Sequence, residues 1–307
     1  MERIIDPNPV APAAPLLPPN DPGNQAIQQR RDPFEDAVSP VEDPSVLNKV
    51  AEVLSKAIGN TTMPAPVSDV VELPVGIVIG GNVVRHARVR ELTGIDEEEI
   101  VRASSTGDLE RFVDALLRGV VSIGDNVASA DLLNKLTVAD RETLIIGIRK
   151  VTYGEEIEFE KVRCFKCEKD YSLVYDLNDF PINKLDDPSQ AIFEVQLRRG
   201  RTARVRLPNG YDQKAIFSEM RNKNLNAAET DSVLLSRLIV DITDQNRTYQ
   251  VSTVEDARAL SMADRKAILD AINKKKVGPD FENALVDCPE CNQQTPVPLN
   301  IPILFRM

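Results

Sequence analysis

Alternating hydrophobic and polar positions predict two β-hairpins in corresponding parts of the chain. In the first, residues 71–79 alternate up to a Gly80-Gly81 turn, and the return strand lies around 88–90. In the second, residues 193–197 alternate before an Arg-Gly turn, and the return strand covers 204–207. Strands are therefore expected to open each half of the folded body.

Apolar positions at helical spacing follow each hairpin. Three helices are expected in each half: after Gly94, over 112–121 and from Thr137 in the first, and after Gly210, over 233–240 and from Ser261 in the second. Thr137 with Asp140, and Ser261 with Asp264, form the Ser/Thr-x-x-acid pattern that caps the first amide groups of a helix.

A further hairpin closes each half. Residues 156–160 and 171–177 alternate on either side of Cys164-Phe165-Lys166-Cys167, which places this cysteine pair at a hairpin tip. The matching segment around Cys288-Pro289-Glu290-Cys291 is followed by several prolines, which allow only short edge strands.

An internal duplication is the strongest signal in the sequence. Leu136–Arg141 matches Leu260–Arg265 at a spacing of 124 residues, and the same spacing relates the two cysteine pairs. Ala87–Arg90 matches Ala203–Arg206 at a spacing of 116 residues, as expected if loops took insertions while elements did not. We therefore predict an α+β fold of two duplicated units, 67–185 and 186–307. Each would be a hairpin plus helices that end in a Cys-x-x-Cys knuckle.

The first 66 residues have a different composition. They hold 12 of the 21 prolines, and such a segment cannot bury enough apolar surface to offset its backbone entropy. We predict an extended arm over 1–66, interrupted by one helix at 44–58. This helix could pack on its own body, or dock in the groove of a partner through its apolar face, which includes Val46, Leu47, Val50 and Leu54.

The four cysteines are the candidate metal ligands. Two knuckles can form a closed tetrahedral four-cysteine zinc site, which is structural because it leaves no position for substrate. The 120 residues between the pairs far exceed the spacing of a compact zinc ribbon, but duplicated units could bring Cys164, Cys167, Cys288 and Cys291 to one shared ion. A thioredoxin-like dithiol, two disulfides, or thiols that are merely buried remain alternatives.

Composition excludes several functions. The net charge of −11 and the aromatic content of 5% argue against a general nucleic-acid binder, and no apolar run approaches the length of a membrane span. A single histidine, His86, leaves no catalytic constellation, so no small-molecule substrate is expected. Without a signal peptide, the chain is expected in a reducing cytoplasm.

An arginine-rich hairpin is the remaining candidate site. Arg198, Arg199 and Arg201 precede Arg204 and Arg206 on one predicted hairpin. These side chains could contact an acidic partner or phosphate, or could simply protect an edge strand from aggregation. A zinc-ribbon regulator that binds nucleic acid through residues 198–206 is the alternative function.

Several motifs together resemble the T-even-type phage baseplate hub assembly proteins. They are Leu136-x-x-x-Asp140-Arg141, Tyr153-Gly154, Cys164-x-x-Cys167, Arg206-Leu207-Pro208 and Cys288-Pro289-Glu290-Cys291, and the likeness covers about residues 70–305. It implies a non-enzymatic protein of contractile tails whose partners are other tail and baseplate hub proteins. It also implies a location in the bacterial host cytoplasm during assembly, with a place in the finished virion left open.

Overall fold

The structure is a computed structural model that describes residues 65–245 and 247–305. The predicted helix at 44–58, with its docking residues Val46, Leu47, Val50 and Leu54, lies outside the described residues. Within the described chain, residues 65–185 are called the first half and residues 186–305 the second half.

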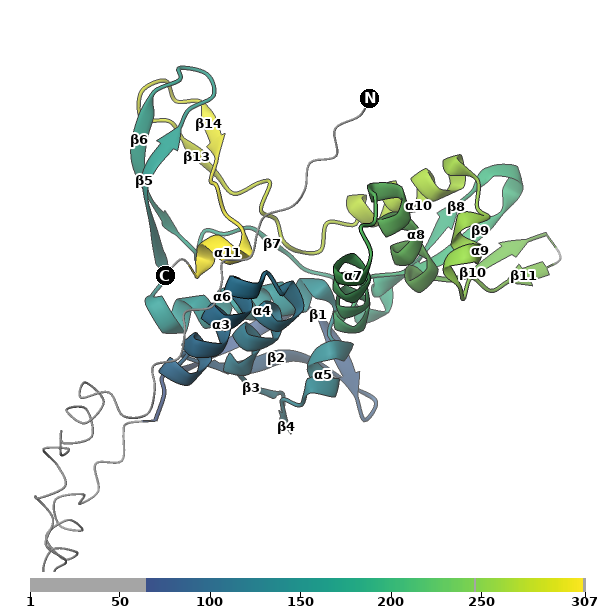
Figure 1. The fold of residues 1–307 in the computed structure, drawn as a ribbon, viewed down its shortest axis with the longest axis horizontal. Helices are drawn as coiled ribbons and strands as arrows, with labels where there is room; N and C mark the ends of the chain where they lie inside the picture. The colour runs from purple at the N-terminus through teal and green to yellow at the C-terminus, as the bar shows by residue number, and fades with distance from the viewer. Residues whose placement is uncertain (1–64, 246, 306–307) are drawn as a thin grey trace, which may run out of the picture. The chain divides into compact units, whose positions relative to one another are not determined.

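The first half contains a four-stranded antiparallel sheet with the strand order β1-β2-β3-β4 (Figure 1). Its strands are β1 (Ser68–Ile79), β2 (Asn82–Arg90), β3 (Val120–Ile123) and β4 (Asn126–Val127). Its helices are α3 (Gly94–Thr106), α4 (Leu109–Leu116), α5 (Ala130–Lys135) and α6 (Val138–Tyr153). The hairpin β5 (Glu156–Arg163) and β6 (Asp170–Asp176) follows, so the hairpins expected at 71–90 and 156–177 are confirmed.

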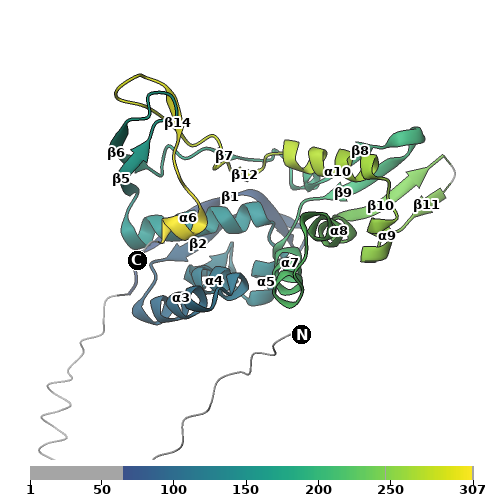
Figure 2. The same cartoon turned by 45° about the horizontal axis from the view of Figure 1, so that its top comes forward.

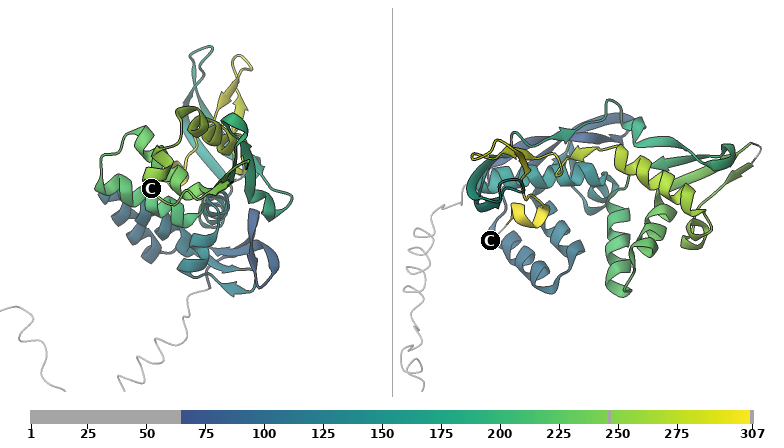
Figure 3. Two further views of the ribbon diagram at one scale, coloured as in Figure 1. Left: turned by 90° about the vertical axis from the view of Figure 1, so that its right-hand side faces the viewer. Right: turned by 90° about the horizontal axis from the view of Figure 1, so that it is seen from above.

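Helix α6 is the centre of the first core. It lies against β1 and β2, and Figure 3 (right) shows α3 and α4 on the same side of this sheet. Leu144, Ile145 and Ile148 are fully or almost fully buried. A Cβ atom at Gly147 would lie 2.3 Å from a methyl carbon of Val71, so only glycine lets the helix approach the strand this closely.

The second half repeats this order of elements. Its sheet has the order β8-β9-β10-β11, made by β8 (Ile192–Gln196), β9 (Thr202–Arg206), β10 (Ile239–Asp244) and β11 (Arg247–Tyr249). Its helices are α7 (Gly210–Asn222), α8 (Ala227–Leu238), α9 (Val254–Arg258) and α10 (Met262–Lys274). A smaller core lies between this sheet and its helices and includes Val205, Leu235 and Ile242. Figure 2 shows α8, α9 and α10 beside the sheet.

The predicted apolar helices at 112–121 and 233–240 are wrong in their extent. Helix α4 ends at Leu116, and β3 begins at Val120 after one short 3-10 turn. Helix α8 ends at Leu238, and β10 begins at the next residue. In each case a buried helix end is followed at once, or after one short turn, by a strand that begins with a buried residue, so the apolar run shows no break at the boundary.

The C-terminal segment returns to the first half. Short strands β7 (Ile182–Asn183) and β12 (Gly278–Pro279) pair, and β13 (Leu285–Asp287) and β14 (Gln294–Pro296) form the last hairpin. The strands at the second cysteine pair are short, as expected. Val297, Leu299 and Phe305, the last of which follows α11 (Ile301–Leu304), are buried in the core around α6. Sequentially distant hairpins therefore lie side by side (Figures 1 and 2).

The halves also meet where α7 packs on α4, α5 and α6. The side chain of Arg141, only 2% exposed, donates hydrogen bonds to the backbone oxygen of Leu133, to Asn134 and to Gln213 of α7. A Cβ at Gly210 would lie 2.7 Å from an Arg141 nitrogen, so the start of α7 fits tightly against this guanidinium. We call this contact the α7 joint.

Candidate metal centre

Two hairpin tips carry the four cysteines in matching backbone geometry. The amide of Cys164 donates to the oxygen of Lys169 at 3.0 Å, and the amide of Cys288 donates to the oxygen of Gln293 at 2.9 Å. The residue after each pair, Glu168 or Asn292, has a left-handed φ of 57° or 55°. Such a turn folds the chain back so that both sulfurs of a pair face the same side.

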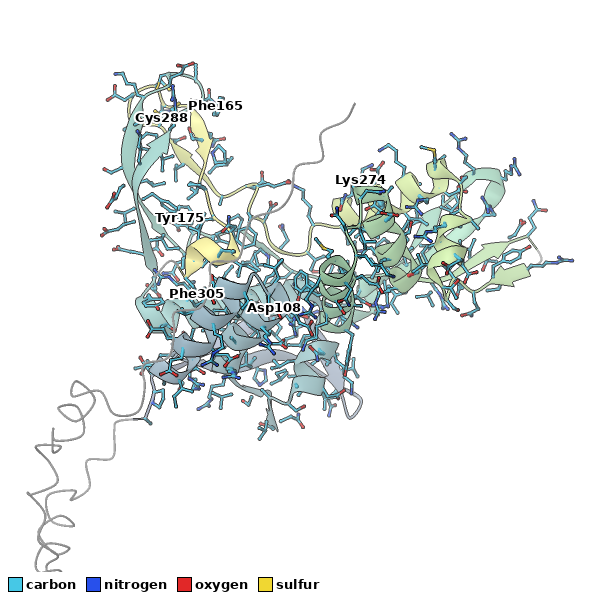
Figure 4. The ribbon with its side chains drawn as sticks, viewed as in Figure 1. Asp108, Phe165, Tyr175, Lys274, Cys288 and Phe305 are labelled. Atoms are coloured by element: carbon cyan, nitrogen blue, oxygen red, sulfur yellow. The ribbon has the colours of Figure 1, made fainter. Side chains whose placement is uncertain are left out.

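The four sulfur atoms lie within 4.8 Å of one another. Across the two hairpins, Cys164 Sγ is 3.7 Å from Cys291 Sγ, and Cys167 Sγ is 3.7 Å from Cys288 Sγ. In a tetrahedral site with zinc–sulfur bonds of about 2.3 Å, sulfurs are about 3.8 Å apart. The cysteine set therefore fits a zinc ion shared between the hairpins. Figure 4 shows Cys288 at the end of this pair of hairpins.

Local hydrogen bonds favour thiolate at one of these positions. Backbone amides of Cys167 and Lys166 point to the Cys164 sulfur and, with the Thr295 hydroxyl, lower its pKa to about 6. Desolvation raises the pKa of Cys291 to about 12, and its hydrogen bonds with the other cysteines add to this rise. Four sulfurs so close together can all be thiolates only when a cation lies among them.

The surroundings of the cysteines hold the two hairpins in place. Thr295, 3% exposed, lies with its hydroxyl 3.8 Å from the Cys164 sulfur. On the surface, Lys169 of one hairpin forms an ion pair with Glu290 of the other. Buried Phe159 and Val297 belong to the same core below the tips. A metal here would join two cysteine pairs that are separated by 120 residues of the chain.

This geometry discriminates between the sequence alternatives. A thioredoxin-like dithiol requires a helix that starts at the first cysteine, whereas both pairs here lie in hairpin loops. Sulfurs 3.7 Å apart are not disulfide-bonded, and all four cysteines are free. A closed site of four sulfur ligands can stabilise the fold but has no open position for catalysis.

A comparison with known protein families shows which family this chain belongs to. A family model described as T4 bacteriophage base plate protein matches residues 79–299. The chain belongs to this family. No curated protein and no solved structure matches it. Membership gives this baseplate protein a structural role in the phage tail and confirms the resemblance at the level of the family. The finer role in hub assembly stays a prediction.

The predicted arginine cluster of this baseplate protein is largely engaged within the chain. Arg201 binds Asp264 at 2.5 Å, Arg204 binds Asp241, and Arg206 binds Asp212 at 2.6 Å. These six residues form three internal ion pairs. Within residues 65–305, only Arg198 and Arg199 of this cluster have no ion-pair partner, and both are exposed at the hairpin tip. Partner binding through these two side chains stays a prediction.

Buried carboxylates are the structural residues that sequence reasoning assigned incompletely. Asp140 does follow the cap residue Thr137, but its carboxylate accepts hydrogen bonds from the amides of Val75 and Gly76 in β1. Asp264 likewise accepts from the amide of Arg198 as well as from Arg201. The two acids thus connect a helix start to the opening hairpin of its half. The repetition of the two acids at the same place in the matching motifs was the sequence signal from which this role could have been predicted.

A second pair of carboxylates sits at the start of α3 and α7. Asp96 is bound by Arg90, and Asp212 by Arg206 and Arg237. Burial opposes ionisation of Asp212, but hydrogen bonds from Arg206 and the Asn209 amide, with the nearby guanidinium charges, hold its pKa below the usual value. These ionised acids fix the turn between strand and helix in each half.

None of the described helices combines the length and apolar character needed to cross a bilayer.

Proposed function

We propose that this baseplate protein acts through protein–protein contacts in the baseplate hub, either as an assembly factor or as a structural adaptor. In this proposal it has no enzymatic activity, and one structural zinc ion shared by Cys164, Cys167, Cys288 and Cys291 fastens its body. Its partners are other tail and hub proteins. It works in the cytoplasm of the infected bacterium, and as an adaptor it would remain in the virion.

The observation that carries the proposal is the meeting of the two cysteine pairs in a member of a baseplate family. The sulfurs come from segments 120 residues apart and are spaced as a tetrahedral thiolate site requires. Zinc binding to such a site contributes directly to folding, because the ligands are assembled only in the folded chain. A rigid, metal-fastened body suits a protein that must hold neighbours at fixed positions.

Metal content per chain tests the zinc directly. The full-length protein, purified without chelator, is expected to contain about one zinc ion per chain by inductively coupled plasma mass spectrometry. Two ions per chain would mean that each pair binds separately. Absence of any metal, with the four thiols free to react with a thiol reagent in the folded state, would reject the shared site.

The choice between assembly factor and adaptor depends on whether the protein stays in the particle. Quantitative mass spectrometry of purified virions is expected to show the chain at a fixed ratio to other baseplate proteins if it is an adaptor. An assembly factor would be abundant in infected cells and absent from virions.

We also infer that the two halves are copies of one ancestral unit. The same sheet order, the Arg90–Asp96 and Arg206–Asp212 pairs, and the matching cysteine tips support this. Arg141 and Arg265 add a further match, because both donate to a backbone oxygen eight residues earlier in the chain. Two units of this kind can present related but different surfaces to neighbours.

A further inference from the structure

We propose that copies of this chain associate head to tail, with α3 of one copy docked on α8 and α9 of the next. The contact would repeat the α7 joint, in which a helix of the second half docks on α4 and α5 of the first. This inference goes beyond the function proposed above. It rests on the correspondence between the halves and does not involve the metal centre.

One face of α7 makes the internal joint. Tyr211 donates a hydrogen bond to Asp131 of α5, and Lys214 forms a 2.6 Å ion pair with Asp114 of α4. Phe217 packs against the first core. Arg221 lies on the same face and forms ion pairs with Asp108 and Glu110.

The corresponding face of α3 has no partner within the described residues. The ion pairs Arg90–Asp96 and Arg206–Asp212 are equivalent in the two halves. Each residue of α3 therefore corresponds to the residue of α7 that lies 116 positions later in the chain. Tyr211 and Phe217 of the joint then correspond to Ile95 and Val101, which are 74% and 49% exposed. Exposed aliphatic side chains at the positions of the two aromatic contacts of the joint make this part of α3 a candidate interaction surface.

The receiving side is also repeated. In the first half, a cavity of about 570 Å³ lies beside α4 and α5, and Lys214 of α7 is among the side chains that line it. In the second half, a cavity of about 600 Å³ lies between α7, α8 and α9. Arg90 and Arg118 line the first cavity at the positions that Arg206 and Arg237 occupy in the second. No described segment of the second half takes the place of α7 there.

The charges at the open cavity select α3 rather than a second α7. Lys214 is matched by Asp114 in the internal joint, but Val233 stands at the position of Asp114 in the second half. The α3 residue that corresponds to Lys214 is the acid Glu98. The cavity of the second half therefore differs from the internal joint in two respects. The incoming helix would carry a negative charge in place of a positive one, and the acid at the position of Asp114 is absent.

An arginine of the open cavity can receive this acid. Arg237 donates to Asp212 through its Nε atom, and its two terminal nitrogens have no hydrogen-bond partner within residues 65–245 and 247–305. Glu219, the one acid lining this cavity, is paired with Lys223 at 2.7 Å. Glu98 of a second copy would thus meet an arginine with free donors.

One exposed apolar side chain lies at a second position that corresponds to a contact of the α7 joint. Met262, at the start of α10, is 88% exposed. It corresponds to Val138 at the start of α6, whose amide donates to the oxygen of Pro208 just before α7. An incoming α3 would bring the equivalent turn, around Leu92, to Met262. The contact is heterologous, so it either closes into a ring or extends as a chain.

The test uses the full chain and two variants that block opposite sides. Ile95→Asp blocks the inserting face, and Met262→Asp blocks the receiving face. Molar mass is measured by analytical ultracentrifugation from about 1 to 100 µM, the range in which a weak contact becomes populated. Wild type is expected to form dimers or larger species as concentration rises, whereas each variant alone stays monomeric.

Mixing the two variants gives the decisive signature. An equimolar mixture is expected to form a one-to-one dimer and nothing larger, because one intact inserting face and one intact receiving face remain. Glu98→Lys should weaken wild-type association at least tenfold, whereas Glu158→Lys, the same charge change on exposed β5, should not. Unchanged melting and zinc content confirm that the variants are folded.

The proposal would be overturned by wild type that stays monomeric at 100 µM, or by blocked variants that associate as strongly as wild type. Association that survives in wild type but is not restored in the mixture would also reject it, since the contact would then lie elsewhere. None of these results bears on the zinc proposal, which is read from metal content.

Discussion

Two of the contacts between the halves of this protein, the cysteine cluster and the α7 joint, are built in opposite ways. At the metal centre, each half contributes two cysteines from matching hairpin tips, and the sulfur spacings of 3.7 Å repeat across the contact. At the α7 joint, a helix of one half meets three helices of the other through unlike side chains. Buried Arg141 and the pair of Lys214 with Asp114 hold that contact.

This difference separates two kinds of stability. The proposed metal centre would need only four thiolates and an ion, so it would depend on metal supply and on proton concentration. The α7 joint depends on side-chain complementarity and buried hydrogen bonds, which no external ligand supplies. Changes at the two contacts should therefore produce different patterns of unfolding.

Removal of a metal ligand is expected to have the largest effect. Cys288→Ser leaves three thiolates and should lower the zinc content below half an ion per chain and the melting temperature by roughly 10 °C or more. Hydrogen exchange should rise in β5–β6 and β13–β14, while the second core around Leu235 keeps its protection. A chelator added to wild type should reproduce this pattern. Uniform loss of protection in both cores would contradict the separation of the two contacts.

Truncation of Arg141 tests how much the α7 joint contributes to the free energy of unfolding. Arg141→Met leaves the Leu133 oxygen and the Asn134 and Gln213 side chains without their donor, and should cost about 2–4 kcal/mol in the free energy of unfolding. Zinc content should not change. Chemical denaturation gives the measurement.

The matched control for Arg141 is its counterpart in the second half. Arg265 donates to the backbone oxygens of Ala257 and Ala228 and to Ser232, but it is only half-buried, and no counterpart of α7 covers it within the described residues. Arg265→Met should therefore cost about 1 kcal/mol. Equal costs for the two variants would show that the joint adds nothing to the local role of the arginine.

The same comparison shows what the sequence could and could not predict. The matching Leu136–Arg141 and Leu260–Arg265 motifs predicted the helices, and the cysteine pairs predicted that four sulfurs lie close together, because both are local patterns with a known physical cause. The α7 joint could not be predicted: Lys214 and Asp114 are ordinary surface residues by pattern, and only the fold brings them together. The prediction of where α4 and α8 end, which is at Leu116 and Leu238, was wrong for a related reason. Burial on both sides of a boundary removes the periodic pattern that would mark it.

The pH response should distinguish α6, the helix that carries Arg141, from the metal centre. Desolvation raises the pKa of Glu142 to about 7, well above its ordinary value of 4.5. Its neutral form is therefore favoured by folding, and the stability from this group is full below about pH 4.5 and lost as the pH rises through 7. Zinc binding to thiolates behaves in the opposite sense and weakens as the pH falls.

Substitution of Glu142 isolates this contribution. Glu142→Gln should leave stability unchanged near pH 4 and raise it by about 1–3 kcal/mol at pH 8, measured by urea denaturation. Lys266 occupies the corresponding place on α10 and is exposed, so Lys266→Gln should show no such pH dependence. A stabilisation of Glu142→Gln that is equal at both pH values would reject the assignment to ionisation.

The smallest effect is expected at the surface pair that joins the two cysteine tips. Lys169 and Glu290 are 60% and 48% exposed, so water screens their attraction and the side chains lose entropy when they pair. Lys169→Met should shift the melting temperature by no more than about 2 °C and leave zinc content unchanged. A fall as large as that of Cys288→Ser would mean that side-chain pairing at the tips, rather than a shared ion, fastens the hairpins. A small shift in Lys169→Met beside a large one in Cys288→Ser is the result that assigns the contact to the metal.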